Sequence, residues 1–313
     1  MLRWNFPMWL DRLKNLSRNR NSLLVLSLIL GLLWGEGAQW IKGVILPIMM
    51  ILMTVSTLGV TGTTFSSPRS LWAPALVGIG MNYAVLTTFI LVLNALLVGD
   101  KDLRVGFVII AIVPPAVAVV PFTLFLGGDN QFSLLGMIGA YLGALVIAPA
   151  LAFALIGSGF ISPSKLILII IELILAPLVL SRILLRTGLD IHLGSLKGPI
   201  TNWGFFLVSY AIVGLNRETI LSHPLSLLPV ALIAVASTFV LGWGIERIGR
   251  ILHVQPKVVI SLVLLGTLKN YGMAGGMALA LLSEKTSVPA TVSSVFMIVY
   301  IIWLEFKKRH TDH

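Results

Sequence analysis

Apolar runs of about 20 residues recur along almost the whole chain, and this repetition limits the fold more than any other feature. A helix needs about 20 apolar residues to cross the hydrocarbon core of a bilayer. The runs are continuous, whereas the strands of a membrane barrel would alternate. We therefore predict an all-α integral membrane protein with ten membrane-spanning helices: Ser22–Trp40, Gly43–Thr61, Leu71–Val98, Val105–Gly127, Phe132–Gly157, Leu166–Leu185, Pro199–Leu215, Leu225–Ile245, Val258–Leu282 and Val288–Leu304.

Composition narrows the function classes. Only 11% of the 313 residues are charged, against about 25% in a soluble domain, which leaves no room for a soluble catalytic domain. The absence of cysteine excludes thiolate metal sites, and the five histidines show no metal-ligand spacing. The sequence also lacks a phosphate loop and the acidic clusters of intramembrane prenyl transferases. We expect neither an enzyme nor a bound cofactor or metal.

The net charge of +10 follows the membrane topology instead of indicating nucleic-acid binding. With the N-terminus in the cytoplasm, the cytoplasmic side carries Arg3, Arg12, Lys14, Arg18, Arg20, Arg69, Arg182, Arg186, Lys197, Arg247, Arg250, Lys257, Lys307, Lys308 and Arg309. The opposite side carries only Lys42, Lys101, Arg104, Lys165, Arg217 and Lys285. This excess predicts a multi-pass protein of the cell (inner) membrane with both termini cytoplasmic.

Two predicted spans are interrupted near their middle. The fourth contains VPPAVAVVP (Val113–Pro121), and the ninth contains GTLKNYGMAGG (Gly266–Gly276). Positions four and nine match in two five-helix halves, and an odd number of helices places the second half upside down. We therefore predict a basic amphipathic segment at residues 1–21, a first repeat at 22–157, an inverted second repeat at 158–306, and a cytoplasmic tail at 307–313.

The prolines explain how the fourth span breaks. Pro114, Pro115 and Pro121 remove backbone donors, and the pre-proline restriction is expected to push Val113, Pro114 and Val120 out of helical geometry. Carbonyls freed in this way are tolerated only beside other protein or a water-filled cavity. Two breaks that meet would form a polar centre of the kind in which secondary transporters bind cargo. A simple proline kink is the alternative.

Lys269 is the strongest single signal, because a lysine at mid-helix depth costs about 2.5 to 3.5 kcal/mol to insert. It lies next to Asn270 and Tyr271, with Gly266, Gly272, Gly275 and Gly276 nearby. Snorkelling is the alternative, but the lysine lies too far from either end of its span to reach an interface. We expect Lys269 to act at a hydrated site beside the helix break.

Further polar residues lie within the predicted spans. Glu172 is the one acid deep inside a span; it is a candidate partner of Lys269, or a neutral carboxyl on a polar seam. Asn82, Thr123, Ser133 and Tyr271 are candidate binding residues, and each is equally explained by an interhelical hydrogen bond.

At its two interrupted spans the sequence resembles the bile acid:sodium symporter family, whose members are ten-helix carriers of organic anions. The stretch PPAVAVVPFTLFLGGDNQFS is similar to that family's fourth-helix motif, with its Gly128-Asp129 turn and Ser133. The stretch NYGMAGGMALALL, followed by VPATVSSVF, is similar to its Asn-x-Gly-x-Ala element and proline-led tenth helix. The resemblance implies panel and core domains, two unwound helices that cross in the core, and substrate between the domains.

The chain departs from this family where sodium would bind. The family's Ser-Asn pair aligns with Val119 and Val120, its ninth-helix glutamate with Leu265, and its fifth-helix threonine with Met137. A family glutamine aligns with Lys269, and only Ser133, Asn270 and Asn82 keep an oxygen. A sodium ion needs a cage of oxygens, so this alignment predicts that the Lys269 ammonium replaces the ion.

The sequence therefore predicts a sodium-independent secondary transporter of a small organic anion in the lipid bilayer. Pro114, Pro115, Val120, Pro121, Lys269 and Asn270 are expected at its centre. Proton coupling, exchange and uniport stay open, and the sequence does not indicate the oligomeric state. Two alternatives remain: an efflux carrier of the type that exports auxin-like acids, and a membrane sensor that binds its ligand without moving it.

Overall fold

A computed structural model describes residues 20–58, 68–116, 118–156, 168, 171–194, 196–215, 217–222 and 224–311. These residues form an all-helical structure, and the one β-type contact among them is an isolated bridge between Pro115 and Lys269. Six helical stretches are long and apolar enough to cross a membrane: Gly35–Val55, Trp72–Leu97, Asn130–Ile156, Lys197–Leu215, Leu228–Ile251 and Glu284–Lys308. The predicted membrane class is confirmed at this level.

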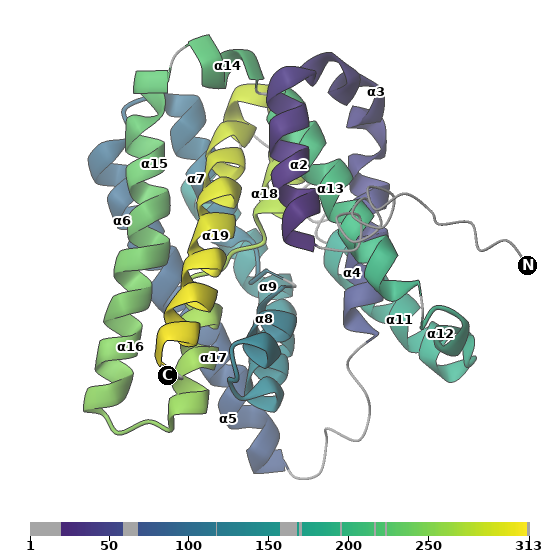
Figure 1. Cartoon of the computed structure of the whole chain (residues 1–313), viewed down its shortest axis with the longest axis vertical. Coiled ribbons are helices and arrows are strands. Elements are labelled where there is room, and N and C mark those ends of the chain that lie inside the picture. The colour runs from purple at the N-terminus through teal and green to yellow at the C-terminus, as the bar shows by residue number, and fades with distance from the viewer. Residues whose placement is uncertain are drawn as a thin grey trace, which may run out of the picture.

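The helices pack into two groups that lie side by side (Figure 1). The α13 group comprises α2 (Arg20–Leu33), α3 (Ala38–Ile41), α4 (Ile45–Thr57), α11 (Ala176–Arg186), α12 (Leu189–His192) and α13 (Lys197–Leu215). The α19 group comprises α5 (Pro68–Ile79), α6 (Thr88–Leu97), α7 (Lys101–Ile112), α8 (Val119–Phe125), α9 (Asn130–Ile156), α15 (Leu228–Val235), α16 (Leu241–Ile251), α17 (Pro256–Leu265), α18 (Tyr271–Leu281) and α19 (Glu284–Thr311). The short helix α14 (Arg217–Ser222) connects them.

The described residues include three π-helical segments, in which each backbone N–H bonds to the carbonyl five residues before it. Gly80–Thr87 joins α5 to α6, Ala236–Val240 joins α15 to α16, and Ile171–Leu175 leads into α11. The first predicted span ends earlier than expected: α2 stops at Leu33, and Gly35–Gly37 form a tight turn against α13. The basic segment at residues 1–21 lies almost wholly outside the described residues.

Both predicted interruptions are present. The fourth span is divided into α7 and α8 by residues 113–118, and the ninth into α17 and α18 by residues 266–270. The two breaks cross, because Ala116 N donates to Leu268 O at 3.0 Å and Asn270 N donates to Pro114 O at 3.1 Å. The paired backbone replaces helical hydrogen bonds that neither segment makes for itself.

The expectation that Val120 leaves helical geometry is wrong. Helix α8 starts at Val119, so Val120 and Pro121 lie in its first turn. A proline is tolerated there because the first N–H groups of a helix have no intrahelical partner. Helix α8 therefore starts two residues before Pro121, and the only prolines within the break are Pro114 and Pro115.

Glycines hold the helices of each group in close contact. A Cβ on Gly78 of α5 would lie 2.1 Å from the backbone oxygen of Gly136 in α9, and one on Gly204 of α13 would lie 2.5 Å from Leu52 of α4. The contact between the groups is looser. A Cβ on Gly272 or Gly276 of α18 would lie no closer than 3.5 Å to the side chains of α4 and α13.

This contrast predicts different outcomes for two glycine substitutions. Gly78→Ala should lower the melting temperature strongly, because overpacking against a backbone costs about 1 to 3 kcal/mol or more. Gly272→Ala should leave it close to the parent value, since the added methyl meets Met49 and Val208 at ordinary contact distance. Thermal unfolding in detergent measures both variants. Equal losses would show that the contact between the groups is as tight as the contacts within them.

Candidate functional site

The proline break in the fourth span releases a run of carbonyls. Pro115 has no N–H to offer the Ala111 carbonyl four residues before it, and α7 ends at Ile112. Each released carbonyl finds a donor elsewhere: Ala111 and Val113 bind Lys269, Ile112 accepts from Tyr83, Pro114 from Asn270 N, and Pro115 from Tyr141. The expected freeing of carbonyls is confirmed, and protein donors from three other segments satisfy them.

Lys269 supplies the central donor. Its Nζ contacts Asn82 Oδ1 at 2.5 Å, Thr87 Oγ1 at 3.0 Å, and the carbonyl oxygens of Ala111 and Val113 at 2.8 Å each. The side chain is fully buried, and its Nζ lies 4.8 Å from the centre of the Tyr83 ring. An ammonium carries three donors and no acceptor, so a nitrogen surrounded by oxygens in this way has the contacts of the charged form. None of these oxygens belongs to a carboxylate.

A π-helical turn brings two of these oxygens together. Asn82 and Thr87 are five residues apart in Gly80–Thr87, and Thr87 Oγ1 lies 3.1 Å from the Asn82 carbonyl oxygen. In an α-helix, residues five apart point in different directions, so an α-helical turn would present only one of them to Lys269. The Thr87 hydroxyl donates to Ala111 O at 2.7 Å, which leaves its oxygen free to accept from the ammonium.

The side chain of Asn270, next to Lys269, makes a second set of hydrogen bonds at the crossing. Its Oδ1 accepts from Met273 N at 3.0 Å and so caps α18. Its Nδ2 contacts the Tyr141 hydroxyl at 3.4 Å and Met53 Sδ at 3.6 Å, and Tyr141 donates to Pro115 O at 3.1 Å. Asn270 therefore acts mainly as the N-cap of α18, and its amide nitrogen also contacts α9 and α4 at the level of the break.

Asn82 Nδ2 is buried at this level with no hydrogen-bond partner among the described residues, whereas the buried Tyr271 hydroxyl lies near the side chain of Ser237. The orientation of the Asn82 amide is fixed, because only its oxygen can accept from Lys269. The amide nitrogen therefore faces away from the ammonium with its two donors unused. Unpaired buried donors are costly, at about 1 to 3 kcal/mol each, and they are common where a protein binds a ligand or water.

Other predicted residues lie apart from the ammonium. Thr123 and Ser133 bind each other at 2.7 Å between α8 and α9, and Thr123 also donates to Val119 O. The side chain of Pro121 lies outside the described ones. The sequence did not identify Thr87, Tyr83 and Tyr141, whose roles depend on a π turn and on helix packing.

Glu172 does not pair with Lys269. It lies in the π-helical segment Ile171–Leu175, which packs against α4, α9 and α11, and its side chain is partly exposed. The oxygens around Lys269 come instead from Asn82, Thr87, Ala111 and Val113. The depth of Glu172 in an apolar run was therefore no guide to its neighbours.

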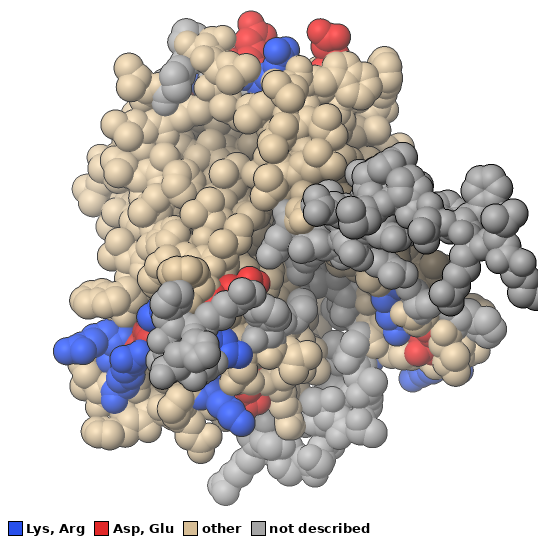
Figure 2. All heavy atoms as spheres, viewed as in Figure 1, with Lys and Arg blue, Asp and Glu red and all other residues tan. Residues whose placement is uncertain are grey.

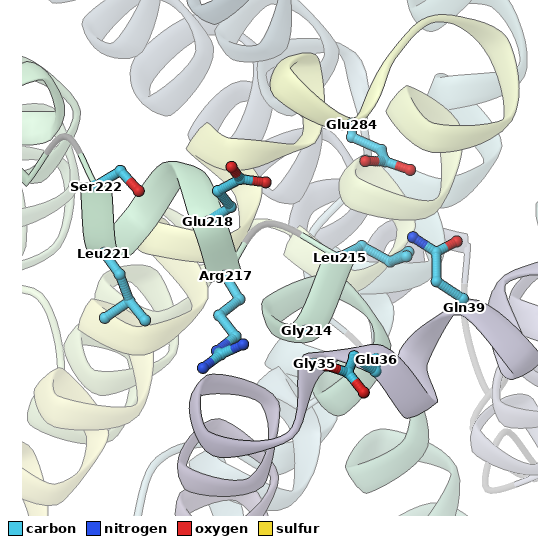
Figure 3. A pocket seen from close by; sticks show the side chains of 10 residues that line it. All are labelled: Gly35, Glu36, Gln39, Gly214, Leu215, Arg217, Glu218, Leu221, Ser222 and Glu284. Atoms are coloured by element: carbon cyan, nitrogen blue, oxygen red, sulfur yellow. The ribbon is translucent and has the colours of Figure 1, made fainter.

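A separate cavity of about 460 Å³ opens at one end of the molecule, where the two groups and α14 meet. Its wall includes Glu36, Gln39, Arg217, Glu218 and Glu284 (Figure 3). None of the residues that bind the Lys269 ammonium lines this cavity. Among the described residues there is also no group of three or more histidine and acidic side chains that could hold a metal ion.

No protein-family model matches this sequence, and no curated protein is significantly similar to it. The chemistry of the site must therefore be inferred from its own residues.

Proposed function

We propose that this protein is a secondary carrier of a small organic anion, that it works by alternating access, and that it does not use sodium. The observation that carries the proposal is the Lys269 ammonium, fully buried where two interrupted helices cross and surrounded only by neutral oxygens. Crossed, interrupted helices are the usual site of substrate in secondary transporters.

The charge of the ammonium favours an anionic cargo. Hydrogen bonds from neutral oxygens stabilise the ammonium, but they do not cancel its charge. A charge in a low-dielectric interior attracts an opposite charge far more strongly than it would in water. An organic anion that enters beside Asn82, whose amide nitrogen has no partner, would gain both this attraction and a hydrogen bond.

Two features argue against sodium. The oxygens that gather around Lys269 Nζ already hold a cation, and it is covalently part of the chain. Val119, Met137 and Leu265, which align with oxygen-bearing side chains in the bile acid:sodium symporter family, are buried in the apolar core. Alkali and alkaline-earth cations are held by oxygen ligands, which these three side chains do not provide.

The proposed topology has ten spans in two inverted repeats, with Lys269 near the membrane midplane. It combines the six long helical stretches with α2, α11 and the two interrupted helices. Lysines and arginines gather at the end of the molecule that carries the C-terminus (Figure 2). By the positive-inside rule this end would face the cytoplasm of the cell (inner) membrane.

A ligand sensor is the second candidate function. The observation that favours it is the saturation of Lys269, whose nitrogen is already surrounded by protein oxygens. An ammonium held in this way could serve to stabilise a rigid crossing. An efflux carrier of auxin-like acids shares the proposed mechanism and differs in cargo and direction.

Flux measurements separate these functions. A thermal-shift screen of short mono- and dicarboxylates, at several pH values and with or without sodium, selects the anion, because a ligand of the folded state raises its stability. We expect uptake of that anion into proteoliposomes to be the same in sodium and in N-methylglucamine buffers. Binding without flux would favour the sensor, and sodium-stimulated uptake would contradict the proposed role of Lys269. A proton gradient then distinguishes proton coupling from exchange and uniport.

A further inference from the structure

The first turn of α19 carries two adjacent ion pairs that point to different helix groups. Glu284 Oε1 binds Lys42 Nζ at 2.7 Å, and Lys42 lies between α3 and α4 in the α13 group. Lys285 Nζ binds Asp100 Oδ2 at 2.6 Å, and Asp100 caps α7 in the same group as α19. The first turn of α19 therefore carries one ion pair that joins the two helix groups, Lys42–Glu284, and one that lies within the α19 group, Asp100–Lys285.

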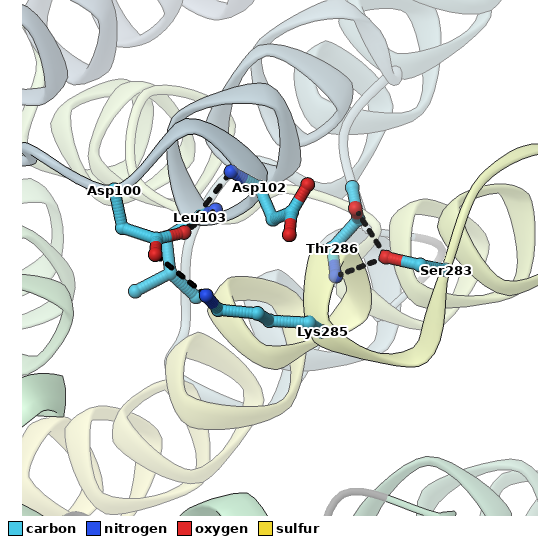
Figure 4. Close-up of polar contacts among 6 residues, drawn as sticks. All are labelled: Asp100, Asp102, Leu103, Ser283, Lys285 and Thr286. Carbon is cyan, nitrogen blue, oxygen red and sulfur yellow. Dashed lines mark hydrogen bonds and ion pairs between the residues drawn. The ribbon is translucent and has the colours of Figure 1, made fainter.

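The pair within the α19 group is part of a fixed corner (Figure 4). Asp100 Oδ1 also accepts from the backbone N–H groups of Asp102 and Leu103 at 3.0 and 3.1 Å. The hydrogen bond from the Lys285 ammonium lowers the pKa of Asp100. The Asp100 carboxylate is therefore protonated only when the pH falls through its lowered pKa. It stays ionised at neutral pH.

The pair between the groups lies at the edge of the surface cavity. Glu284 lines that cavity together with residues of the α2–α3 turn, the end of α13, and α14 (Figure 3). Lys42 therefore draws the α13 group towards α19 at the cavity rim. At the opposite end of α19, Lys307 binds Glu246 of α16, which also binds Arg250, and all three residues belong to the α19 group. Of these four ion pairs, only Lys42–Glu284 joins the two groups.

The contact beneath this pair allows movement. Where α18 meets α4, a Cβ added to Gly276 would lie 3.5 and 3.8 Å from Ile45 and Leu46, and one added to Gly272 would lie 3.5 Å from Met49. These gaps are larger than the close approaches within each group, for which a Cβ would require the backbone to shift. The contact between α18 and α4 is looser than the contacts within each group, and the exposed Lys42–Glu284 pair lies at its edge. Such a contact is suited to opening and closing.

We propose that Lys42–Glu284 is a releasable latch that holds the two helix groups together at the cavity face. The latch rests on the proposed alternating access, in which the α13 group moves against the α19 group. Its release exposes the cavity wall and the α18 surface behind it to the solution on that side. The neighbouring Asp100–Lys285 pair stays closed throughout, because both of its partners move together.

Cysteine accessibility tests the latch without any substrate, and the chain has no cysteine to remove. Leu215→Cys places a reporter on the cavity wall, at a buried position at the end of α13. In this background we expect Lys42→Gln or Glu284→Gln to raise the rate of labelling by a membrane-impermeant maleimide about twofold to fivefold, as suits an exposed pair. Lys285→Gln is the matched control on the same turn, and we expect no change.

Exchange of the charges adds a second measurement. Lys42→Glu with Glu284→Lys should return labelling to the parent rate, whereas either reversal alone should speed it. Equal acceleration in the Lys285→Gln control, or no recovery in the exchanged pair, would overturn the latch.

A cross-link separates the latch from the proposed function. A disulfide between Lys42→Cys and Glu284→Cys should abolish uptake until it is reduced. Full uptake by the cross-linked protein would overturn the latch and keep the carrier. If labelling depends on the ion pair but the protein shows no flux, the latch is kept and the carrier function is overturned.

Discussion

Lys269→Gln should abolish anion uptake while leaving the protein folded. Glutamine is one bond shorter, carries no charge and has only two donors, against the three of an ammonium. The attraction for the anion is lost, and at least one of the oxygens around Nζ loses its donor. We expect uptake to fall at least about a hundredfold, because one unit charge at contact distance contributes about 4 kcal/mol at an effective protein dielectric.

The same variant should melt earlier, and this loss must be measured separately. A buried acceptor without a donor costs about 1 to 3 kcal/mol, which lowers the melting temperature of a protein with a stability of about 5 to 15 kcal/mol but does not unfold it. Uptake is therefore compared per folded protein, as judged by size-exclusion chromatography. Lys285→Gln, which removes a half-exposed lysine, should keep normal uptake. Uptake by Lys269→Gln equal to the parent would reject the role of the ammonium.

Much of the architecture could be predicted because a bilayer imposes a length on apolar helices. Each of the six long stretches overlaps a predicted span, and the two interruptions occur where proline pairs and glycine clusters interrupt apolar runs. The freed carbonyls also followed from chemistry, because a proline cannot donate to the carbonyl four residues before it. The burial of Lys269 followed from its distance to both span ends.

The neighbours of Lys269 could not be predicted in the same way. Thr87 reaches the ammonium only because Gly80–Thr87 winds as a π turn, and such turns are too rare for local sequence to predict. Tyr141 and Tyr83 bind the break through helix packing, which one sequence does not reveal. The sequence makes Glu172 a candidate partner of Lys269 only through its depth in an apolar run. Two residues at the same depth are neighbours only if they also lie in adjacent helices and on the faces that meet.

Asn82→Asp distinguishes an electrostatic role of Lys269 from a structural one. Aspartate is almost the same shape as asparagine and keeps the oxygen that accepts from Nζ at 2.5 Å. Its second oxygen replaces an amide nitrogen that has no hydrogen-bond partner, so no hydrogen bond is lost. The new carboxylate cancels the charge of the ammonium through a charge-assisted hydrogen bond. If the charge attracts the cargo, uptake should fall at least about tenfold, although the melting temperature is unchanged or higher.

Two further variants complete this test. Asn82→Leu removes the accepting oxygen, so it should lower both the melting temperature and the uptake. Asn130→Asp makes the same chemical change as Asn82→Asp at the partly exposed start of α9, where an acidic residue is favourable, and uptake should be normal. Persistence of full uptake in Asn82→Asp would mean that Lys269 stabilises the crossing through its hydrogen bonds alone. A neutral cargo, or a sensor without flux, would then explain the site better than an organic anion does.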